Sequence, residues 1–425
     1  MTARPRRLRE AHAHIAQHGR AMTMLDLSDC RDRDDCLERV AARARAMAGA
    51  PRETWLLGHA LRVQAWRDPA WPDAQQLDEA AGNRPCCVWS FDHHALAANT
   101  AAMRVAGVDR GSPDPEHGRI VRDGRGEPTG LFLERGAWLI WSRIPDDPPA
   151  VRRAQVKAAL ADLAGHGFVE VDELLAPAWL GPLLAELDDA GELVMPVNLY
   201  VPYAEFDQAV RTAPEWTRGR VKLAGAKLFA DGTLNARTAW MLAPFADPLP
   251  GLPCGQPMLT REQIGDALAR MSSLGLTLAV HAIGDGAVRC CLDAAGLSDS
   301  PSFLRVEHAE IIDPADVPRF ARLGVACSVQ PCHLLADIEA LRRGLPHRLD
   351  RVLPLRELID SGCRPGERLW FGSDVPIVRP HPSDSIQAAV HRRRAGEPTD
   401  ARIAPEQAIK EEEAWAAFAP DCGHR

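Results

Sequence analysis

The chain has 425 residues, of which 46% are hydrophobic and 25% are charged, a composition typical of a soluble globular protein with a large core. Its formal net charge of −8 gives no electrostatic reason to expect a nucleic-acid or membrane partner. The eleven cysteines are odd in number and form no CxxC pair, which favours buried reduced thiols and a cytoplasmic location over a disulfide framework. No run of 18 apolar residues predicts a membrane span, and the basic start lacks the apolar segment of a signal peptide.

A first strand is expected over residues 10–15, within an opening segment of residues 1–19, and it carries His12 and His14. Side chains two residues apart on a strand point to the same side. Two imidazoles with this spacing can hold one metal ion, although a His-x-His pair is also common by chance.

Residues 20–150 are expected to form a large insertion after this strand. Turn-rich loops such as GSPDPEHG separate its helical and strand patterns. The helices are expected over residues 34–48, 73–81 and 94–106, and the strands over 54–58 and 86–91. We interpret this region as a lid that packs on the rest of the protein and contributes to substrate specificity.

From residue 151 to residue 425, helical and strand patterns alternate regularly. The strands are expected over residues 168–172, 193–201, 224–230, 277–281, 303–308, 325–330 and 369–374, and the helices over 151–166, 177–190, 261–274, 287–295, 314–323, 354–361 and 384–394. Such alternation predicts parallel strands joined by right-handed crossovers. With the first strand included there are eight units, which predicts an α/β fold of the (β/α)8 TIM-barrel type, with the insertion between strands 1 and 2.

Polar side chains stand at or near the carboxyl ends of several of these strands, where (β/α)8 barrels place their chemistry. Imidazole nitrogen and carboxylate oxygen suit zinc, and also iron, manganese or nickel. Any one of these residues alone could be a core histidine or a helix cap, but several together predict a metal site. The candidate ligands are His12, His14, Lys227, His281, His308 and Asp374.

Lys227 lies in an apolar strand pattern, where an ammonium group is costly unless it is neutralised or paired. One interpretation is an ion pair with Asp231. The other is loss of the proton followed by carboxylation, which would convert the amine into an anionic ligand able to bridge two metal ions.

Seven segments together resemble the amidohydrolase superfamily, in the branch that contains the N-substituted formamide deformylases. They follow the family's order and are EAHAH at 10–14, SFDHHALAANTAAM at 90–103, GEPTGLFLE at 126–134, KLFADGTLNARTA at 227–239, AVHAIGDGA at 279–287, RVEHAEIIDPADVPRFARLGVACSVQPCH at 305–333 and FGSDVPI at 371–377. They cover most of residues 10–390, so the resemblance does not depend on one short motif.

The resemblance implies a set of metal ligands. His12 and His14 would bind a buried ion, and a carboxylated Lys227 would bridge it to a second ion. His281 and His308 would bind that second ion. The implied cofactor is therefore one or two divalent ions, with zinc as the expected metal.

The same resemblance implies catalytic and substrate-binding residues. Asp374 would act as general acid and base beside an activated hydroxide, and His308 and His94 are the other candidate catalytic residues. The residues expected to approach the substrate are His94, Glu134, Asp231 and His333.

The sequence also departs from the family's pattern. Only eleven residues precede His12, so the small β-sandwich that flanks the barrel in relatives is expected to be absent or minimal, which leaves a homodimer as a candidate assembly. Glu10 stands where relatives usually have Asp, and VEVDELL replaces the usual His-Asp ending of strand two.

The leading hypothesis is a metal-dependent hydrolase that acts on a small-molecule substrate. It would use an activated hydroxide to cleave a C–N bond other than a peptide bond, in an amide, a formamide or a cyclic amide. A lactonase, esterase or deaminase could use the same site, since the fold alone does not fix the reaction. A metal-poor relative that binds a ligand or a partner protein without catalysis is the alternative from another class, and metal content would distinguish it.

Overall fold

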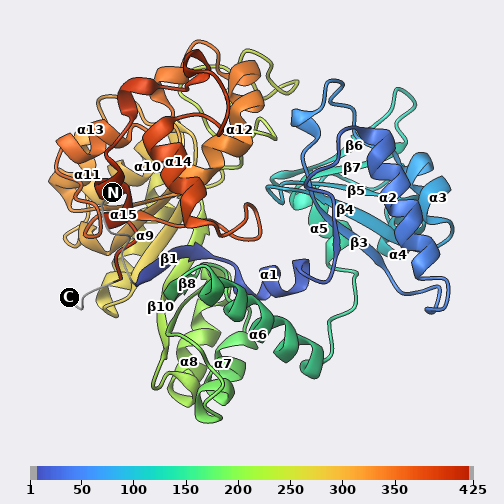
Figure 1. The fold of residues 1–425 in the computed structure, drawn as a ribbon, viewed down its shortest axis with the longest axis horizontal. Helices are drawn as coiled ribbons and strands as arrows, with labels where there is room; N and C mark the ends of the chain where they lie inside the picture. Colours follow the sequence, from blue (N-terminus) through green and yellow to red (C-terminus); the bar gives the residue numbers. More distant parts are fainter. Residues whose placement is uncertain (1–6, 421–425) are drawn as a thin grey trace. The chain divides into compact units, whose positions relative to one another are not determined.

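The computed structural model describes residues 7–420, which form two compact units (Figure 1). One unit comprises the chain up to Gly19 together with the residues from Arg153 onward, and the other comprises Arg20–Arg152. The first unit contains a barrel of parallel strands, and the second contains a separate mixed sheet.

The sheet of the first unit has eight strands, and each neighbouring pair along it is parallel. The strands, in order around the sheet, are β1 (Leu8–Ala13), β8 (Phe168–Glu173), β9 (Val197–Pro202), β10 (Val221–Phe229), β11 (Thr277–Ala282), β12 (Leu304–His308), β13 (Ala326–Val329) and β14 (Leu369–Phe371). A parallel bridge between Ala13 and Val375 brings the segment after β14 to the end of β1. The predicted (β/α)8 barrel is therefore confirmed.

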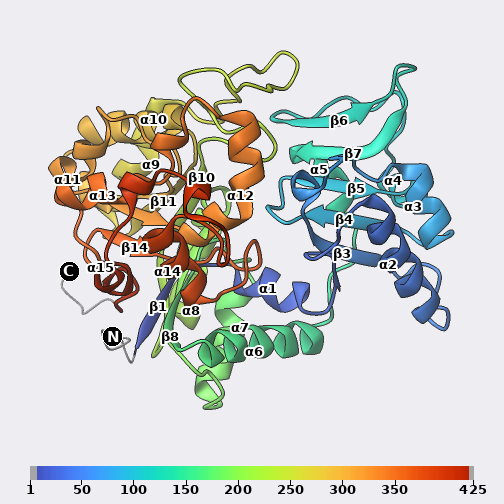
Figure 2. The same cartoon turned by 45° about the horizontal axis from the view of Figure 1, so that its top comes forward.

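Helices surround these strands (Figure 2). They are α1 (Ile15–Ala21), α6 (Pro149–Gly165), α7 (Leu180–Asp189), α8 (Phe206–Trp216), α9 (Arg261–Ser273), α10 (Asp285–Gly296), α11 (Val317–Leu323), α12 (Pro331–Gly344), α13 (Leu355–Asp360), α14 (Pro382–His391) and α15 (Glu411–Ala416). The patterns did not predict α8 or α12. Proline obscured both, because α8 contains Pro214 and α12 begins at Pro331, where the first turn tolerates it.

The second unit is built on a six-stranded sheet covered by helices (Figure 1). In order along the sheet its strands are β2 (Leu25–Asp26), β3 (Leu56–Leu61), β4 (Cys86–Ser90), β5 (Ala95–Ala98), β7 (Pro128–Glu134) and β6 (Gly118–Arg122). The helices are α2 (Arg33–Ala46), α3 (Ala74–Ala81), α4 (Thr100–Ala106) and α5 (Arg135–Trp141). The pairs from β2 to β4 are parallel, and those from β4 to β6 are antiparallel.

The helix expected over residues 94–106 is wrong in its first half. Residues Ala95–Ala98 form β5, which pairs with β4 and β7, and the helix starts only after Asn99. The side chain of Asn99 accepts a hydrogen bond from the backbone N–H of Ala102 and so caps α4. The alanines favour a helix locally, but hydrogen bonding to β4 on one side and β7 on the other stabilises the segment as a strand.

Two expectations from composition can be compared with the described residues. The ten cysteines in that part of the chain are all free thiols, and only Cys254 among them is partly exposed. No helix between residues 7 and 420 has both the length and the apolar character needed to cross a membrane.

Candidate metal centre

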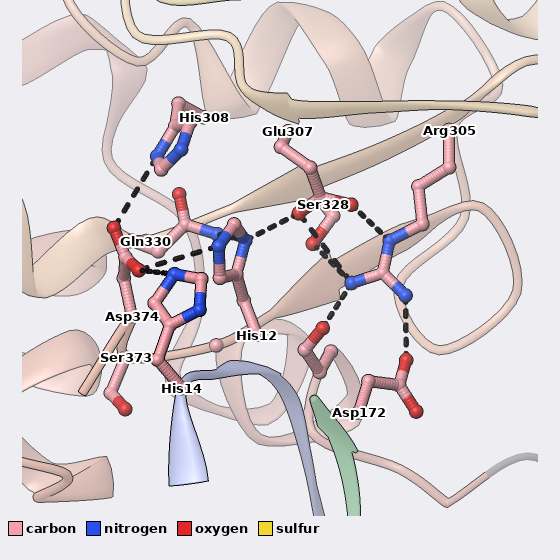
Figure 3. Close-up of polar contacts among 12 residues, drawn as sticks. His12, His14, Asp172, Arg305, Glu307, His308, Ser328, Gln330, Ser373 and Asp374 are labelled. Carbon is pink, nitrogen blue, oxygen red and sulfur yellow. Dashed lines mark hydrogen bonds and ion pairs between the residues drawn. The ribbon is translucent and has the colours of Figure 1, made fainter. Parts of the chain in front are cut away.

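β1 and the residue after it carry two imidazoles that face one carboxylate. The rings of His12 and His14 point to Asp374, which follows β14 (Figure 3). Oδ1 of Asp374 lies 3.3 Å from Nε2 of His12 and 3.0 Å from Nε2 of His14. Gly372 permits this close approach, because a Cβ at its position would lie 2.6 Å from the backbone nitrogen of His12. The first and last strands of the barrel therefore build one site.

Glu10 ties β1 to the segment after β14. Its Oε1 accepts hydrogen bonds from the backbone N–H of His12 at 3.0 Å and of Ser373 at 2.8 Å. Burial raises the pKa of the Glu10 carboxyl to about 8. The residue that replaces the family's usual Asp thus holds the backbone on which the site is built.

Three further histidines lie at the same end of the barrel. His308 ends β12 with its Nδ1 4.0 Å from Oδ2 of Asp374, and Nε2 of His333 in α12 lies 3.8 Å from the same oxygen. His281 in β11 contacts His308, with 4.4 Å between the ring centroids. Nε2 of His281 donates to the carbonyl of Gly232 at 3.1 Å, so Nδ1 holds the lone pair when this ring is neutral.

Several nitrogen atoms of this cluster are buried without a hydrogen-bond partner among residues 7–420. They are Nε2 of His12, Nδ1 of His14, Nδ1 of His308 and Nε2 of His333. Buried polar atoms left unsatisfied are costly and therefore rare. His12, His308 and Asp374 each offer a ligand atom within 4.8 Å of the others, and so do His308, Glu310 and His333. These residues fit a divalent cation that takes nitrogen and oxygen ligands.

The ionisation states suit the binding of a cation. Burial lowers the pKa of His12 and of His308 well below its ordinary value, which favours the neutral form of both rings. Burial alone would raise the pKa of Asp374, but His12 and His14 hold it below its usual range. Burial alone would lower the pKa of His14, but Asp374 and Glu173 raise it to about 9. Neutral imidazole and ionised carboxylate are the forms that bind metal ions, so His14 must lose a proton to become a ligand.

Lys227 lies in β10 with only 2% of its surface exposed. Its Nζ is 5.5 Å from the centroid of the Phe229 ring, and within the described chain it forms no ion pair, with Asp231 or any other carboxylate. Burial lowers the pKa of Lys227 to about 8, although Glu307 and Asp374 act in the opposite direction. A larger fraction of this amine is therefore neutral at physiological pH than for an ordinary lysine, and the neutral amine is the form that carboxylation requires.

Asp231 organises the loop after β10. Its Oδ1 accepts a hydrogen bond from the backbone N–H of Ile283 at 3.0 Å, and its Oδ2 accepts from Gly284 at 2.8 Å and Trp240 at 2.9 Å. Oδ1 also lies 3.7 Å from Nε2 of His281. The carboxylate thus joins this loop to the end of β11, and its contact with a substrate stays a prediction.

The backbone is strained at two residues of the cluster around Asp374. His308 has a φ of 70° and Asp374 a φ of 62°, in the left-handed region that residues other than glycine rarely adopt. Such conformations persist where surrounding interactions impose them, and they gather at functional sites. The strain coincides here with the two residues that face each other at the strand ends.

His94 and Glu134 lie in the second unit, where they form a close pair. Nδ1 of His94 is 2.6 Å from Oε2 of Glu134, which ends β7 and has a φ of 51°. Oδ1 of Asp92 accepts the backbone N–H of His94 at 3.2 Å and the hydroxyl of Ser90 at 2.5 Å. The structure brings the two predicted residues together, and their approach to a substrate stays a prediction.

A layer of charged side chains inside the barrel was missed by the sequence patterns. Arg305 on β12 contacts Glu307 and donates to Oδ2 of Asp172 at 2.6 Å and to the hydroxyl of Ser328 at 3.0 Å (Figure 3). Oε2 of Glu307 in turn lies 2.6 Å from Nδ1 of His12. These side chains are at most 1% exposed. The available signal was the alternation of charged and apolar residues in RVEH, which is unusual for a buried strand.

The family model of the amidohydrolase family matches residues 8–421. The chain belongs to this family. It is 28% identical to YtcJ of Bacillus subtilis strain 168 over 411 residues, which covers 91% of this chain and 73% of that protein. It is also 26% identical to an N-substituted formamide deformylase of Arthrobacter pascens, with 98% of this chain and 78% of that protein covered.

The fold of this amidohydrolase is found in solved structures. A crystal structure of an uncharacterised metal-dependent hydrolase from Pyrococcus horikoshii OT3 superposes with a TM-score of 0.74 at 24% identity. The likeness covers 97% of this chain and 79% of that protein, and it shows that the two share a fold. Membership of the amidohydrolase family supports a hydrolase.

Proposed function

We propose that this amidohydrolase is a metal-dependent enzyme that cleaves a C–N bond other than a peptide bond, in an amide, a formamide or a cyclic amide. The observation that carries the proposal is the set of buried imidazole nitrogens of His12, His308 and His333 that converge on the Asp374 carboxylate without other partners. The relative named N-substituted formamide deformylase, similar over nearly the whole chain, supports the type of bond.

The proposed ligands divide between two positions. His12, His14 and Asp374 would hold one divalent ion, and His281 with His308 would hold a second. A carboxylated Lys227 would be a ligand of both ions. The burial of Lys227 and its lowered pKa support carboxylation. Nitrogen and carboxylate ligands favour zinc, with iron, manganese and nickel as the other metals that suit such a set.

A divalent ion at such a site lowers the pKa of water towards neutrality and polarises a carbonyl group. The contribution of Asp374 would be to accept a proton at its carboxylate and to return that proton to the leaving nitrogen. Its depressed pKa keeps it ionised, and the hydrogen bond from its backbone N–H to the His12 carbonyl fixes its position.

Substrate contacts are assigned to His333 and to the pair of His94 and Glu134. His333 would direct its Nε2 into the site beside Asp374. Both carboxylate oxygens of Asp231 already accept backbone N–H groups, so we assign its effect on substrate binding to the loop that it holds beside His281.

The proposal is tested by metal content and by a substrate screen on the same preparations. Protein purified without chelator should contain about one to two equivalents of zinc or another transition metal per chain, and His12→Ala should contain less. The wild type should release formate or another carboxylate from N-substituted formamides and N-acyl amines faster than it hydrolyses lactones and simple esters. A chain that neither contains nor takes up metal would instead be a non-catalytic relative, and preference for lactones or esters would exclude the C–N assignment.

A further inference from the structure

Two carboxylates flank His308 in the sequence, and each contacts the ring of a different histidine. Oε2 of Glu307 lies 2.6 Å from Nδ1 of His12, which belongs to β1 (Figure 3). Oε1 of Glu310 lies 3.3 Å from Nδ1 of His333, which belongs to α12. One short segment at the end of β12 therefore contacts Nδ1 of two imidazoles that come from distant parts of the chain.

The backbone of this segment turns between the two carboxylates. His308 has a φ of 70° and Ala309 a φ of 43°, so two successive residues adopt the left-handed conformation. Neither is glycine, and the surrounding structure must therefore stabilise the turn. The turn ends β12 and leaves Glu307 and Glu310 buried, with 0% and 5% of their surfaces exposed.

The proton on His12 can be assigned from its partners. Glu307 also contacts the guanidinium of Arg305, and a carboxylate only accepts hydrogen bonds. The short contact with Glu307 therefore places the hydrogen of His12 on Nδ1. The side-chain nitrogen of Gln330 lies 3.2 Å from the same atom, a longer and uncharged contact that does not compete with it. The lone pair of His12 is then on Nε2.

The same reasoning applies to His333. Its Nδ1 contacts Glu310, so the hydrogen of the neutral ring belongs on Nδ1 and the lone pair on Nε2. Nε2 of His333 and Nε2 of His12 are both buried and make no hydrogen bond to residues 7–420. They lie 3.8 Å and 3.3 Å, respectively, from oxygens of the Asp374 carboxylate. The Nε2 atoms of both rings thus face the same carboxylate.

We propose that Glu307 and Glu310 are positioning residues that fix the tautomers of His12 and His333, with Nδ1 protonated and Nε2 open towards Asp374. The significance of this arrangement rests on the proposed function, because an imidazole binds a metal or accepts a proton only through an unprotonated nitrogen. Carboxylates that hold the second nitrogen of such a ring also raise its basicity and fix its orientation. On this assignment Glu310 acts through His333 and is not itself a ligand.

The test uses the full chain with ¹⁵N-labelled histidine, in metal-free protein and after titration with zinc. Nitrogen chemical shifts distinguish a protonated from an unprotonated ring nitrogen, and His12→Ala and His333→Ala identify the signals. The variants are Glu307→Gln, Glu310→Gln and Glu310→Ala. Asp316→Asn is the matched control, because Asp316 is a buried carboxylate of the same unit that pairs only with Arg289 and Arg319 in the described structure.

We expect the wild-type spectra to show His12 protonated only at Nδ1. Burial alone would lower the pKa of His333, but Glu310 raises it to about 9, so His333 should carry a proton at Nδ1 throughout and lose its Nε2 proton above that pH or when zinc binds. Glu310→Ala should give His333 a mixture of tautomers, and Glu310→Gln should restore the wild-type form because an amide oxygen still accepts the hydrogen bond. Both Glu310 variants should bind as many zinc ions as the wild type. An unchanged His333 signal in Glu310→Ala, or loss of a zinc ion in Glu310→Gln, would overturn the assignment of Glu310.

Glu307→Gln should keep the number of zinc ions at saturation but weaken their binding by about 10- to 100-fold in competition with a chelator. Zinc affinity no weaker than that of Asp316→Asn would overturn the assignment of Glu307. If Glu307→Gln does not fold because Arg305 loses one of its two anionic partners, the tautomer of His12 in the wild type tests the assignment of Glu307, since protonation at Nε2 would contradict the proposal. A wild type without metal would refute the proposed function, while the metal-free spectra would still test the tautomers.

Discussion

The backbone N–H of Asp374 donates to the carbonyl oxygen of His12 at 2.7 Å. This bond joins the segment after β14 to β1, and it places the proposed general base beside the proposed metal ligand through the backbone. The side chains of the same two residues approach to 3.3 Å. Closure of the barrel and assembly of the site are therefore one structural event, and changes that open the β1–β14 seam should disturb both.

Replacing Asp374 with Asn tests its role as the proton acceptor. Asn keeps the size of the side chain and one oxygen but cannot accept a proton, so turnover should fall by about 10²- to 10⁴-fold. The measurements are kcat on the best formamide or amide substrate, metal content per chain and the thermal midpoint. A small loss of turnover in a folded, metal-loaded variant would show that another group carries the proton.

Lys227 offers a direct test of carboxylation. Protein loaded with metal in ¹³C-labelled bicarbonate should show a carbamate carbon signal, because the buried amine has a lowered pKa of about 8 and a neutral amine reacts with CO2. Lys227→Met should lack this signal and bind fewer ions, since the apolar replacement fills the buried space without offering a ligand. Full metal content in Lys227→Met would exclude Lys227 as a ligand, whatever its modification.

The strand ends were predictable from the sequence because the ligand types repeat at the same place in successive units. His281 follows an apolar run, His308 ends the next expected strand, and the structure brings their rings to 4.4 Å between centroids. The short β1 could not be bounded as well, and His14 lies just beyond it rather than within the strand expected over 10–15. A strand of six residues with charged side chains on its inner face has little apolar pattern to define it.

Residues that act through other residues were not predictable in the same way. In the sequence, Glu307 and Glu310 are two acidic residues near His308 with no pattern that indicates a role. Only the three-dimensional structure shows that they contact His12 and His333. Likewise, the alanines before Asn99 favoured a helix until pairing with β4 and β7 was known. Sequence periodicity reports burial along one element, whereas these features depend on contacts between elements far apart in the chain.

His94→Ala should reduce turnover and leave metal content unchanged. Nδ1 of His94 is held by Glu134 at 2.6 Å, so the ring has a fixed orientation suited to contact a substrate. Loss of one substrate-orienting group should cost roughly 10- to 100-fold in kcat/KM. The check is steady-state kinetics with parallel metal analysis, and Glu134→Gln should show a smaller effect in the same direction. Loss of metal in His94→Ala would make His94 a ligand and refute the substrate-binding role.

The charged layer inside the barrel should matter for stability as well as for the site. Arg305→Met removes the cationic partner of Glu307 and one of the two arginines that pair with Asp172, and leaves buried carboxylate charge uncompensated. We expect the free energy of unfolding to fall by about 3–5 kcal/mol. The measurement is denaturant unfolding of the metal-free protein, so that weaker metal binding does not contribute.

The control for this prediction is Arg218→Met. Arg218 pairs with Asp189 at 2.6 Å, but both side chains are largely exposed, at 45% and 60%. Water screens such a pair, so its loss should cost no more than about 1 kcal/mol. The double variant with Arg305→Met and Glu307→Gln should lose less than the sum of the two single variants, because it removes both charges of the pair. Equal destabilisation by Arg305→Met and Arg218→Met would mean that the buried network is not a source of stability, and its role would then be confined to orienting His12.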